Sequence, residues 1–201
     1  MKRSTFLMAL VAGLLGCAAP DQMRSEVTRF NQLPATGGSA LLVAADPRKS
    51  SDPMFRLYAR RASDRLQGAG FKLAAGGEPD YVVQLDYWQQ PVEGGHDDSS
   101  PRLSLGIGGA SFGGHSTVGM GVGTSFSLDG RNRDPLALRM VSVVIERRAD
   151  GSRVFEGRAQ SVGPAGNFAG AVPYMIDAIF TGFPGENGKT ITVNAVVEPA
   201  R

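Results

Sequence analysis

A short apolar segment followed by the only cysteine of the chain limits what this chain can fold into. Lys2 and Arg3 precede ten mostly apolar residues, Phe6 to Leu15, and Cys17 comes directly after Gly16. Ten residues is about half of the roughly 20 that a membrane-spanning helix needs, so the segment is typical of a cleaved signal peptide. We therefore expect the fold to be built from the residues after position 16, without disulfides.

The residues around Cys17 indicate a lipid anchor. Leu14 lies three positions before Cys17, Gly16 lies directly before it, and this pattern resembles the lipobox of bacterial lipoprotein signal peptides. We expect residues 1–16 to be removed by cleavage between Gly16 and Cys17, and Cys17 to be acylated and attached to a membrane. The alternative is an ordinary signal peptide, for which Ala18-Ala19 offers small residues at a cleavage site.

Without the leader, the chain carries no net formal charge. Removing Lys2 and Arg3 from 21 basic residues leaves 19, which equals the 19 acidic residues. A neutral body argues against nucleic-acid binding, whose mark is a basic patch or stripe. Acylation would consume the single thiol, which excludes redox and thiolate chemistry.

The remaining 185 residues (201 minus 16) are enough for one hydrophobic core. We expect residues 17–25 to form a tether and residues 26–201 a single α+β domain. The elements described next predict a mixed, mainly antiparallel sheet, two helices packed on it, and a glycine-rich β-hairpin at about 102–127.

Two segments have the pattern of amphipathic helices. Asp52 is a good N-cap, Pro53 suits the first helical position, and apolar residues recur at helical spacing until Gly68. A second apolar stripe predicts a helix over about 168–180.

Alternating and β-branched segments predict the strands. Asp150-Gly151 is a strong hairpin signal between two of them. The strand that begins at Leu136 is apolar on both faces, which favours a central position in the sheet. The expected strands are 26–30, 39–45, 79–88, 136–148, 152–162 and 189–197.

A glycine cluster from Gly106 to Gly123 follows its own pattern. Large residues such as Leu105 and Val122 alternate with glycine, which predicts a hairpin with one nearly bare face. Such a ribbon allows close approach of a partner or of a second copy. A pore-forming hairpin is a weaker alternative, because the bare face offers little polarity to a lumen.

Two glycine-containing motifs do not match phosphate-binding loops. The segment 106–111 ends in Ser111 where the dinucleotide fingerprint requires glycine, and no helix pattern follows. The segment 185–190 ends like a Walker motif, but that motif requires a glycine five positions before Gly188, where this chain has Phe183. We expect neither a nucleotide nor any other cofactor.

Several short motifs together resemble the bacterial lipoproteins of domain of unknown function 4136. They are the lipobox at Cys17, the helix end at 68–71, the strand entry at 78–83, the glycine-alternating hairpin, and 180–185 before the last strand. The resemblance covers roughly Val27 to Val197. It implies an α+β domain on the periplasmic side of a Gram-negative envelope, with no established activity. Ala18 is similar to the residue that follows the lipidated cysteine in lipoproteins sorted to the outer membrane.

No catalytic or metal-binding set stands out in the sequence. His96 and His115 both lie in glycine-rich segments, and His96 next to two acids falls short of the three or four ligands of a metal site. Asp80, Asp86 and Glu146 are candidates for a carboxylate pair only in the sense that they lie on expected strands, and we interpret them as ordinary strand-edge and surface acids.

Four arginines share the polar face of the first helix. They are Arg56, Arg60, Arg61 and Arg65, and Asp64 interrupts them. We interpret this face as a solvated surface, with contact to anionic lipid as the alternative.

The sequence therefore predicts a lipid-anchored envelope protein with a structural or interaction role, and no enzyme. Its expected partners are the membrane, through acylated Cys17, and a protein or a second copy, through the hairpin. The alternatives are a periplasmic hydrolase acting on envelope material and a hairpin-mediated oligomeric assembly.

Overall fold

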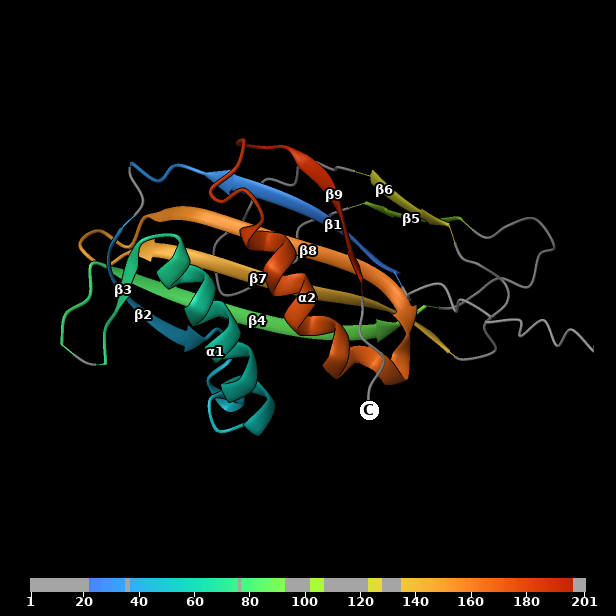
Figure 1. Ribbon diagram of the computed structural model, residues 1–201, viewed down its shortest axis with the longest axis horizontal. Coiled ribbons are helices and arrows are strands. Elements are labelled where there is room, and N and C mark those ends of the chain that lie inside the picture. Colours follow the sequence, from blue (N-terminus) through green and yellow to red (C-terminus); the bar gives the residue numbers. More distant parts are fainter. Residues whose placement is uncertain are drawn as a thin grey trace, which may run out of the picture.

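A computed structural model describes residues 22–34, 37–75, 77–92 and 135–196, together with the backbone of 102–106 and 123–127. In these residues a seven-stranded mixed sheet carries two helices on one face (Figure 1). The predicted fold class, α+β with a mainly antiparallel sheet and two helices packed on it, is confirmed. The elements in chain order are β1 (Gln22–Asn31), β2 (Gly38–Ala44), η1 (Pro47–Lys49), α1 (Pro53–Gly68), β3 (Phe71–Leu73), β4 (Tyr81–Pro91), β5 (Arg102–Gly106), β6 (Gly123–Ser127), β7 (Leu136–Arg147), β8 (Arg153–Pro164), η2 (Ala165–Asn167), α2 (Phe168–Phe180) and β9 (Thr190–Val196).

The strand order of the main sheet is β3-β2-β4-β7-β8-β1-β9. β2 runs parallel to both β3 and β4, and the other neighbours are antiparallel. β7 is the central strand, as its two apolar faces predicted. One register row crosses four strands through Glu26, Gln160, Met140 and Trp88.

β1 begins at Gln22, four residues before the expected start at position 26. The extra residues pair with β9, where Gln22 lies opposite Val196 and Ser25 lies opposite Val193. This pairing joins segments more than 160 positions apart, so the local pattern around Gln22 gave no sign of it.

α1 has the bounds that its sequence signals predicted. The Asp52 carboxylate accepts a hydrogen bond from Met54 N at 2.9 Å and Pro53 occupies the first turn. This cap satisfies one of the free N–H groups at the start of the helix. The apolar stripe of α1 is buried and consists of Phe55, Tyr58, Ala62 and Leu66.

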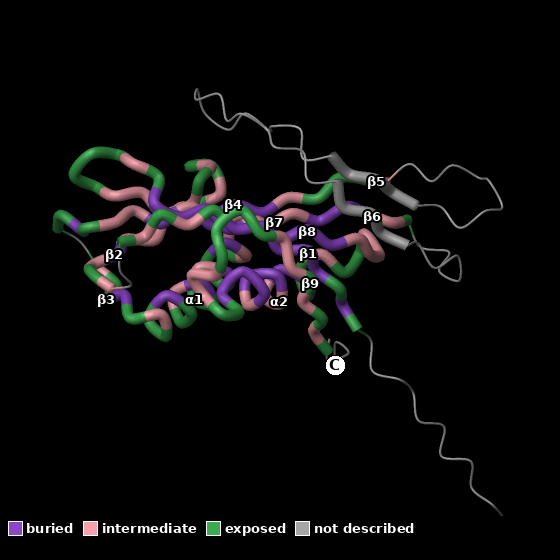
Figure 2. The backbone as a smooth tube through the Cα atoms, turned by 90° about the horizontal axis from the view of Figure 1, so that it is seen from above, coloured by how far each residue is buried: buried purple, intermediate pink, exposed green. Residues whose placement is uncertain are grey.

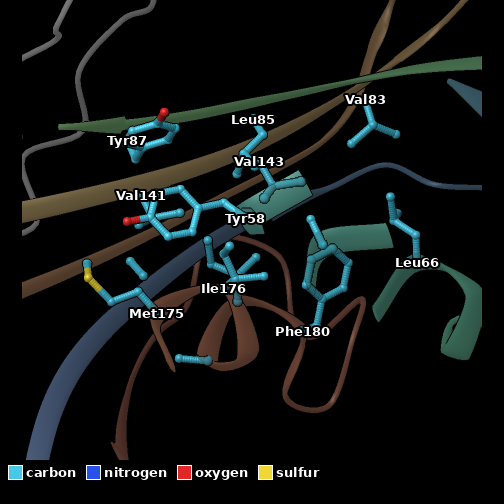
Figure 3. Packing of buried hydrophobic residues seen from close by; sticks show 14 of the residues in the cluster. Tyr58, Leu66, Val83, Leu85, Tyr87, Val141, Val143, Met175, Ile176 and Phe180 are labelled. Atoms are coloured by element: carbon cyan, nitrogen blue, oxygen red, sulfur yellow. The ribbon is translucent and has the colours of Figure 1, made fainter. Parts of the chain in front are cut away.

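The core lies between the helices and the sheet, as the burial colouring shows (Figure 2). Tyr58 and Leu66 of α1 and Met175 and Ile176 of α2 point toward strand residues such as Val143 (Figure 3). Neither described helix has the length and apolarity that crossing a membrane requires.

α2 packs closely on the middle of the sheet because β8 has a glycine there. A Cβ built on Gly157 would lie 2.6 Å from Ile179 Cγ2 and 3.0 Å from the Phe155 ring. Any side chain at this position would therefore push α2 away from the sheet.

The end of α2 is held by a buried arginine of β1. Arg29 Nη2 donates hydrogen bonds to the carbonyls of Ala178 at 2.9 Å and Thr181 at 2.7 Å. Ala178 is in the last turn of α2 and Thr181 is its C-cap, so both carbonyls lie where the helix supplies no further i+4 donor; Ala178 O also accepts from Thr181 N at 3.3 Å. The segment after α2 returns to the same residue, because Gly188 N donates to Arg29 O at 2.8 Å. Residues 182–188 are therefore a turn built around Arg29.

β5 and β6 form a separate antiparallel pair, with Leu103 opposite Phe126. Their side chains, and the glycine-rich segment between them, lie outside the described residues. The glycine-faced hairpin therefore stays a prediction.

Candidate functional site

The three carboxylates singled out from the sequence have separate partners; Asp86 and Glu146 lie on strands as expected, whereas Asp80 lies directly before β4. Asp80 accepts hydrogen bonds from Ser39 N and Ser39 Oγ, both at 2.7 Å. Glu146 accepts one from Gln84 at 3.0 Å. Within the described ranges, no three His, Cys, Asp or Glu side chains come together as a metal ion would require.

The third carboxylate, Asp86, belongs to a cluster that ties η1 to β4. Lys49 Nζ lies 2.6 Å from Asp86 Oδ1, 2.6 Å from Tyr87 O, and 4.6 Å from the centre of the Tyr87 ring. Tyr87 Oη donates a hydrogen bond to Asp52 at 3.1 Å. The pKa of Tyr87 is raised, mainly by burial and to a smaller extent by this hydrogen bond. Because every polar group here has a partner within the cluster, we interpret it as a structural tie.

The basic face of α1 divides into two pairs of arginines. Arg61 and Arg65 both contact Asp177 of α2, with Nε to Oδ1 distances of 2.7 Å in each case. Burial alone would raise the pKa of Asp177, but the hydrogen bonds from Arg65 and Arg61 lower it below its usual value. This pair of arginines therefore joins the two helices.

The other pair, Arg56 and Arg60, lines a groove. Both side chains are exposed, and neither forms an ion pair with an acid of the described residues. The groove has a volume of about 490 Å³ and runs between α1 and the sheet edge. Its apolar walls include Ala40, Leu42, Phe55, Ala59 and Leu73, and the acid Asp64 also lines it.

The sheet edge in this groove is half open. β3 pairs with β2 only at Gly38, Ser39 and Ala40. Residues Leu41 to Ala44 therefore have no strand partner on that side within the described part of the chain.

The backbone hydrogen bonds show which groups face the opening. Ala40 O accepts from Ala74 N at 2.9 Å on the β3 side, whereas Ala45 N donates to Leu85 O at 3.0 Å on the β4 side. Backbone groups of successive residues in a strand point to opposite edges. The N–H and C=O groups of Leu42 and Ala44 consequently point into the open side.

We take this groove as the candidate functional site, because it combines free backbone groups, apolar walls and two arginines that form no ion pair within the described residues. The sequence identified Arg56 and Arg60 only as members of a longer basic face. It did not identify Leu42 and Ala44, since the shortness of β3 had no sequence signal. Gly16, Cys17, His96 and His115 lie outside the described residues.

No protein-family model and no curated protein sequence matches the chain. Among solved structures, the chain is similar to a PDZ domain protein from Parabacteroides distasonis, with 11% identity and a TM-score of 0.47. That alignment covers 87% of this chain and 39% of the other, so the chain spans about two fifths of that protein.

The chain is also similar to PelC from Paraburkholderia phytofirmans, described as a dodecamer. One PelC structure has 10% identity and a TM-score of 0.41, covering 77% of this chain and 94% of that one. A variant of PelC gives 10% identity, a TM-score of 0.40, and coverage of 77% and 93%. At these values the similarities carry no argument about function.

Proposed function

We propose that this protein is a lipid-anchored protein of the bacterial cell envelope that acts as an interaction module and not as an enzyme. The observation that carries the interaction role is the groove beside β2, where an open sheet edge meets Arg56 and Arg60 of α1. An exposed edge without protection is a ready template for pairing with another chain.

The lipid anchor is supported by the sequence. Lys2, Arg3, the apolar segment and Gly16-Cys17 have the order of a lipoprotein signal peptide. The resemblance to lipoproteins of domain of unknown function 4136 supports the periplasmic side of the envelope as the location, and Ala18 after Cys17 supports the outer membrane. The predicted glycine-rich hairpin remains a second proposed surface for a partner or for self-association.

The anchor is tested with Cys17→Ala in the full-length protein expressed in a Gram-negative host. The native chain should fractionate with membranes, and its intact mass should show three acyl chains on Cys17. The Cys17→Ala protein should lose both properties. A native chain that carries a free thiol, or keeps its leader, would contradict the anchor.

The interaction role is tested separately by photo-crosslinking in cells. A crosslinking amino acid replaces Ala59, which lines the groove, and in a matched control it replaces Ala149, an exposed residue of the β7–β8 turn. We expect a discrete adduct from position 59 that is absent from position 149. Equal adducts from both positions, or none from position 59, would count against the groove as an interaction site.

A further inference from the structure

We propose that the groove binds an extended, acidic peptide segment of a partner protein, which adds to the open edge of β2 as a new strand. This inference rests on the proposed interaction function and names the class of partner that the site takes.

The backbone of β2 supplies the first argument. Leu42, which lines the groove, and Ala44 present N–H and C=O groups to the open edge of β2, and an added strand satisfies these groups with main-chain hydrogen bonds. Natural edges are usually protected by charged residues, proline or a bulge. The open segment, Leu41-Leu42-Val43-Ala44, has no charged residue and no proline.

The direction of α1 supplies the second argument. α1 begins beyond the C-terminal end of β2 and leads back to β3, which pairs with the N-terminal half of β2. The first half of α1, with Arg56 and Arg60, therefore lies beside the open half of β2. Asp64 also lines the groove, but it is farther along α1, toward the half that β3 already covers.

The spacing of the two arginines matches an extended ligand. Side chains four positions apart on a helix have Cβ atoms about 6 Å apart. Alternate side chains on one face of a strand repeat at about 6.6 Å. Two acidic residues separated by one residue can therefore each meet one arginine, forming charge-assisted hydrogen bonds.

The same charges disfavour a second copy of this chain as the occupant. Pairing two β2 edges about a two-fold axis keeps both α1 helices on the same face of the joined sheet. Arg56 and Arg60 of one copy would then face the same arginines of the other copy. Like charges across an interface oppose association, whereas an acidic strand complements them.

The test uses the full-length protein in detergent and the labelled peptide Thr-Val-Glu-Val-Glu-Val-Thr, with fluorescence anisotropy as the readout. A second peptide has lysine in place of both glutamates. We expect the glutamate peptide to bind at least tenfold more tightly than the lysine peptide. The double variant Arg56→Glu/Arg60→Glu should reverse this preference, and Arg148→Glu, which changes an exposed arginine outside the groove, should leave it unchanged.

Strand addition is tested independently of charge. Ala44→Pro removes an outward N–H without removing a hydrogen bond to β4, so it should fold and yet bind the glutamate peptide about tenfold more weakly. Near-ultraviolet circular dichroism verifies folding. In the native chain, peptide binding should slow amide hydrogen exchange at Leu42 and Ala44 about tenfold or more.

The proposal is overturned if the glutamate peptide fails to bind, or if the charge-reversed variant keeps the original preference. Unchanged exchange at Leu42 and Ala44 on peptide binding also overturns it, as does concentration-dependent self-association that displaces the peptide. Displacement of the peptide by phosphatidylglycerol vesicles would assign the arginines to lipid instead. A specific crosslinked partner from position 59 together with any of these results would leave the interaction function standing while the strand-addition inference fails.

Discussion

At the residue scale, single side chains decide how closely the helices approach the sheet. Gly157 and Asp177 show this in opposite ways. Gly157 has no side chain, which lets α2 lie close to β8. Asp177 joins α2 to α1 through ion pairs with Arg61 and Arg65.

Gly157→Ala should destabilise the protein by about 2 kcal/mol, because the added Cβ would lie 2.6 Å from Ile179 and must displace α2. Urea unfolding measures the change. Gly68→Ala is the control, since nothing lies within 4 Å of its Cβ and alanine favours a helix. A neutral Gly157→Ala would show that α2 shifts without cost.

Because of Asp177, the free energy of unfolding should decrease as the pH falls into the acid range. Its folded-state pKa is lowered by Arg65 and Arg61 below the usual 3.8, so its contribution is complete above about pH 4 and disappears as the pH falls through the lowered pKa. Asp177→Asn should cost about 1 kcal/mol at pH 7 and less at pH 2, as measured by thermal unfolding.

The matched control for Asp177 is Asp64→Asn, which changes an exposed acid on α1. It should have a smaller effect at pH 7. If Asp177→Asn destabilises the protein equally at both pH values, its effect comes from packing and not from the ion pairs.

At the element scale, β1 and α2 are held together by Arg29. Its side chain satisfies carbonyls at the end of the helix, and burial lowers the pKa of its guanidinium. The aromatic residue Phe183, which follows in the same turn, packs against the Phe155 ring at 4.8 Å and the Phe180 ring at 5.3 Å. The motif at residues 180–185, before the last strand, is therefore explained by its packing in the core and its place in the turn around Arg29.

Arg29→Met should destabilise the protein by about 2–3 kcal/mol, because it removes a charged donor from the carbonyls of Ala178 and Thr181. Amide exchange in the last turn of α2 should accelerate before that of α1. Arg24→Met, which removes a side chain that is 55% exposed, should cost less than about 1 kcal/mol. Equal costs for both variants would show that Arg29 has no special role at the helix end.

At the scale of the whole molecule, the direction of β1 predicts how an anchored domain stands on the membrane. β1 begins five positions after Cys17, which allows at most about 17 Å of extended chain. β8 runs antiparallel to β1 and its 12 residues span about 40 Å. The C-terminal end of β8 should therefore lie near the lipid and the β7–β8 turn far from it.

Fluorophores on Gly166→Cys and Ala149→Cys test this orientation, since the proposed acylation of Cys17 would leave the introduced cysteine as the only thiol. Brominated lipids should quench the label at position 166 more strongly than the label at position 149. Equal quenching would indicate that the domain lies flat or that the anchor is absent.

Much of the local structure followed from the sequence. The bounds of α1, the Asp150-Gly151 hairpin and the central place of β7 were all predicted correctly. Each depends on neighbours within a few residues, such as the Asp52 cap, or on a strand being apolar on both faces. The start of β1 at Gln22 was missed because its partner strand lies at the other end of the chain.

The sequence by itself determined the helices and most strand segments, because caps and periodicity act over short stretches of chain; it also predicts a leader over residues 1–16. Only the tertiary structure decided the strand order, the role of Arg29 and the open edge at Leu42 and Ala44. These features depend on which distant segments meet. Because β3 ends after three residues, the second half of β2 has no strand partner on that side among the described residues, and the residues of β2 themselves give no sign of this.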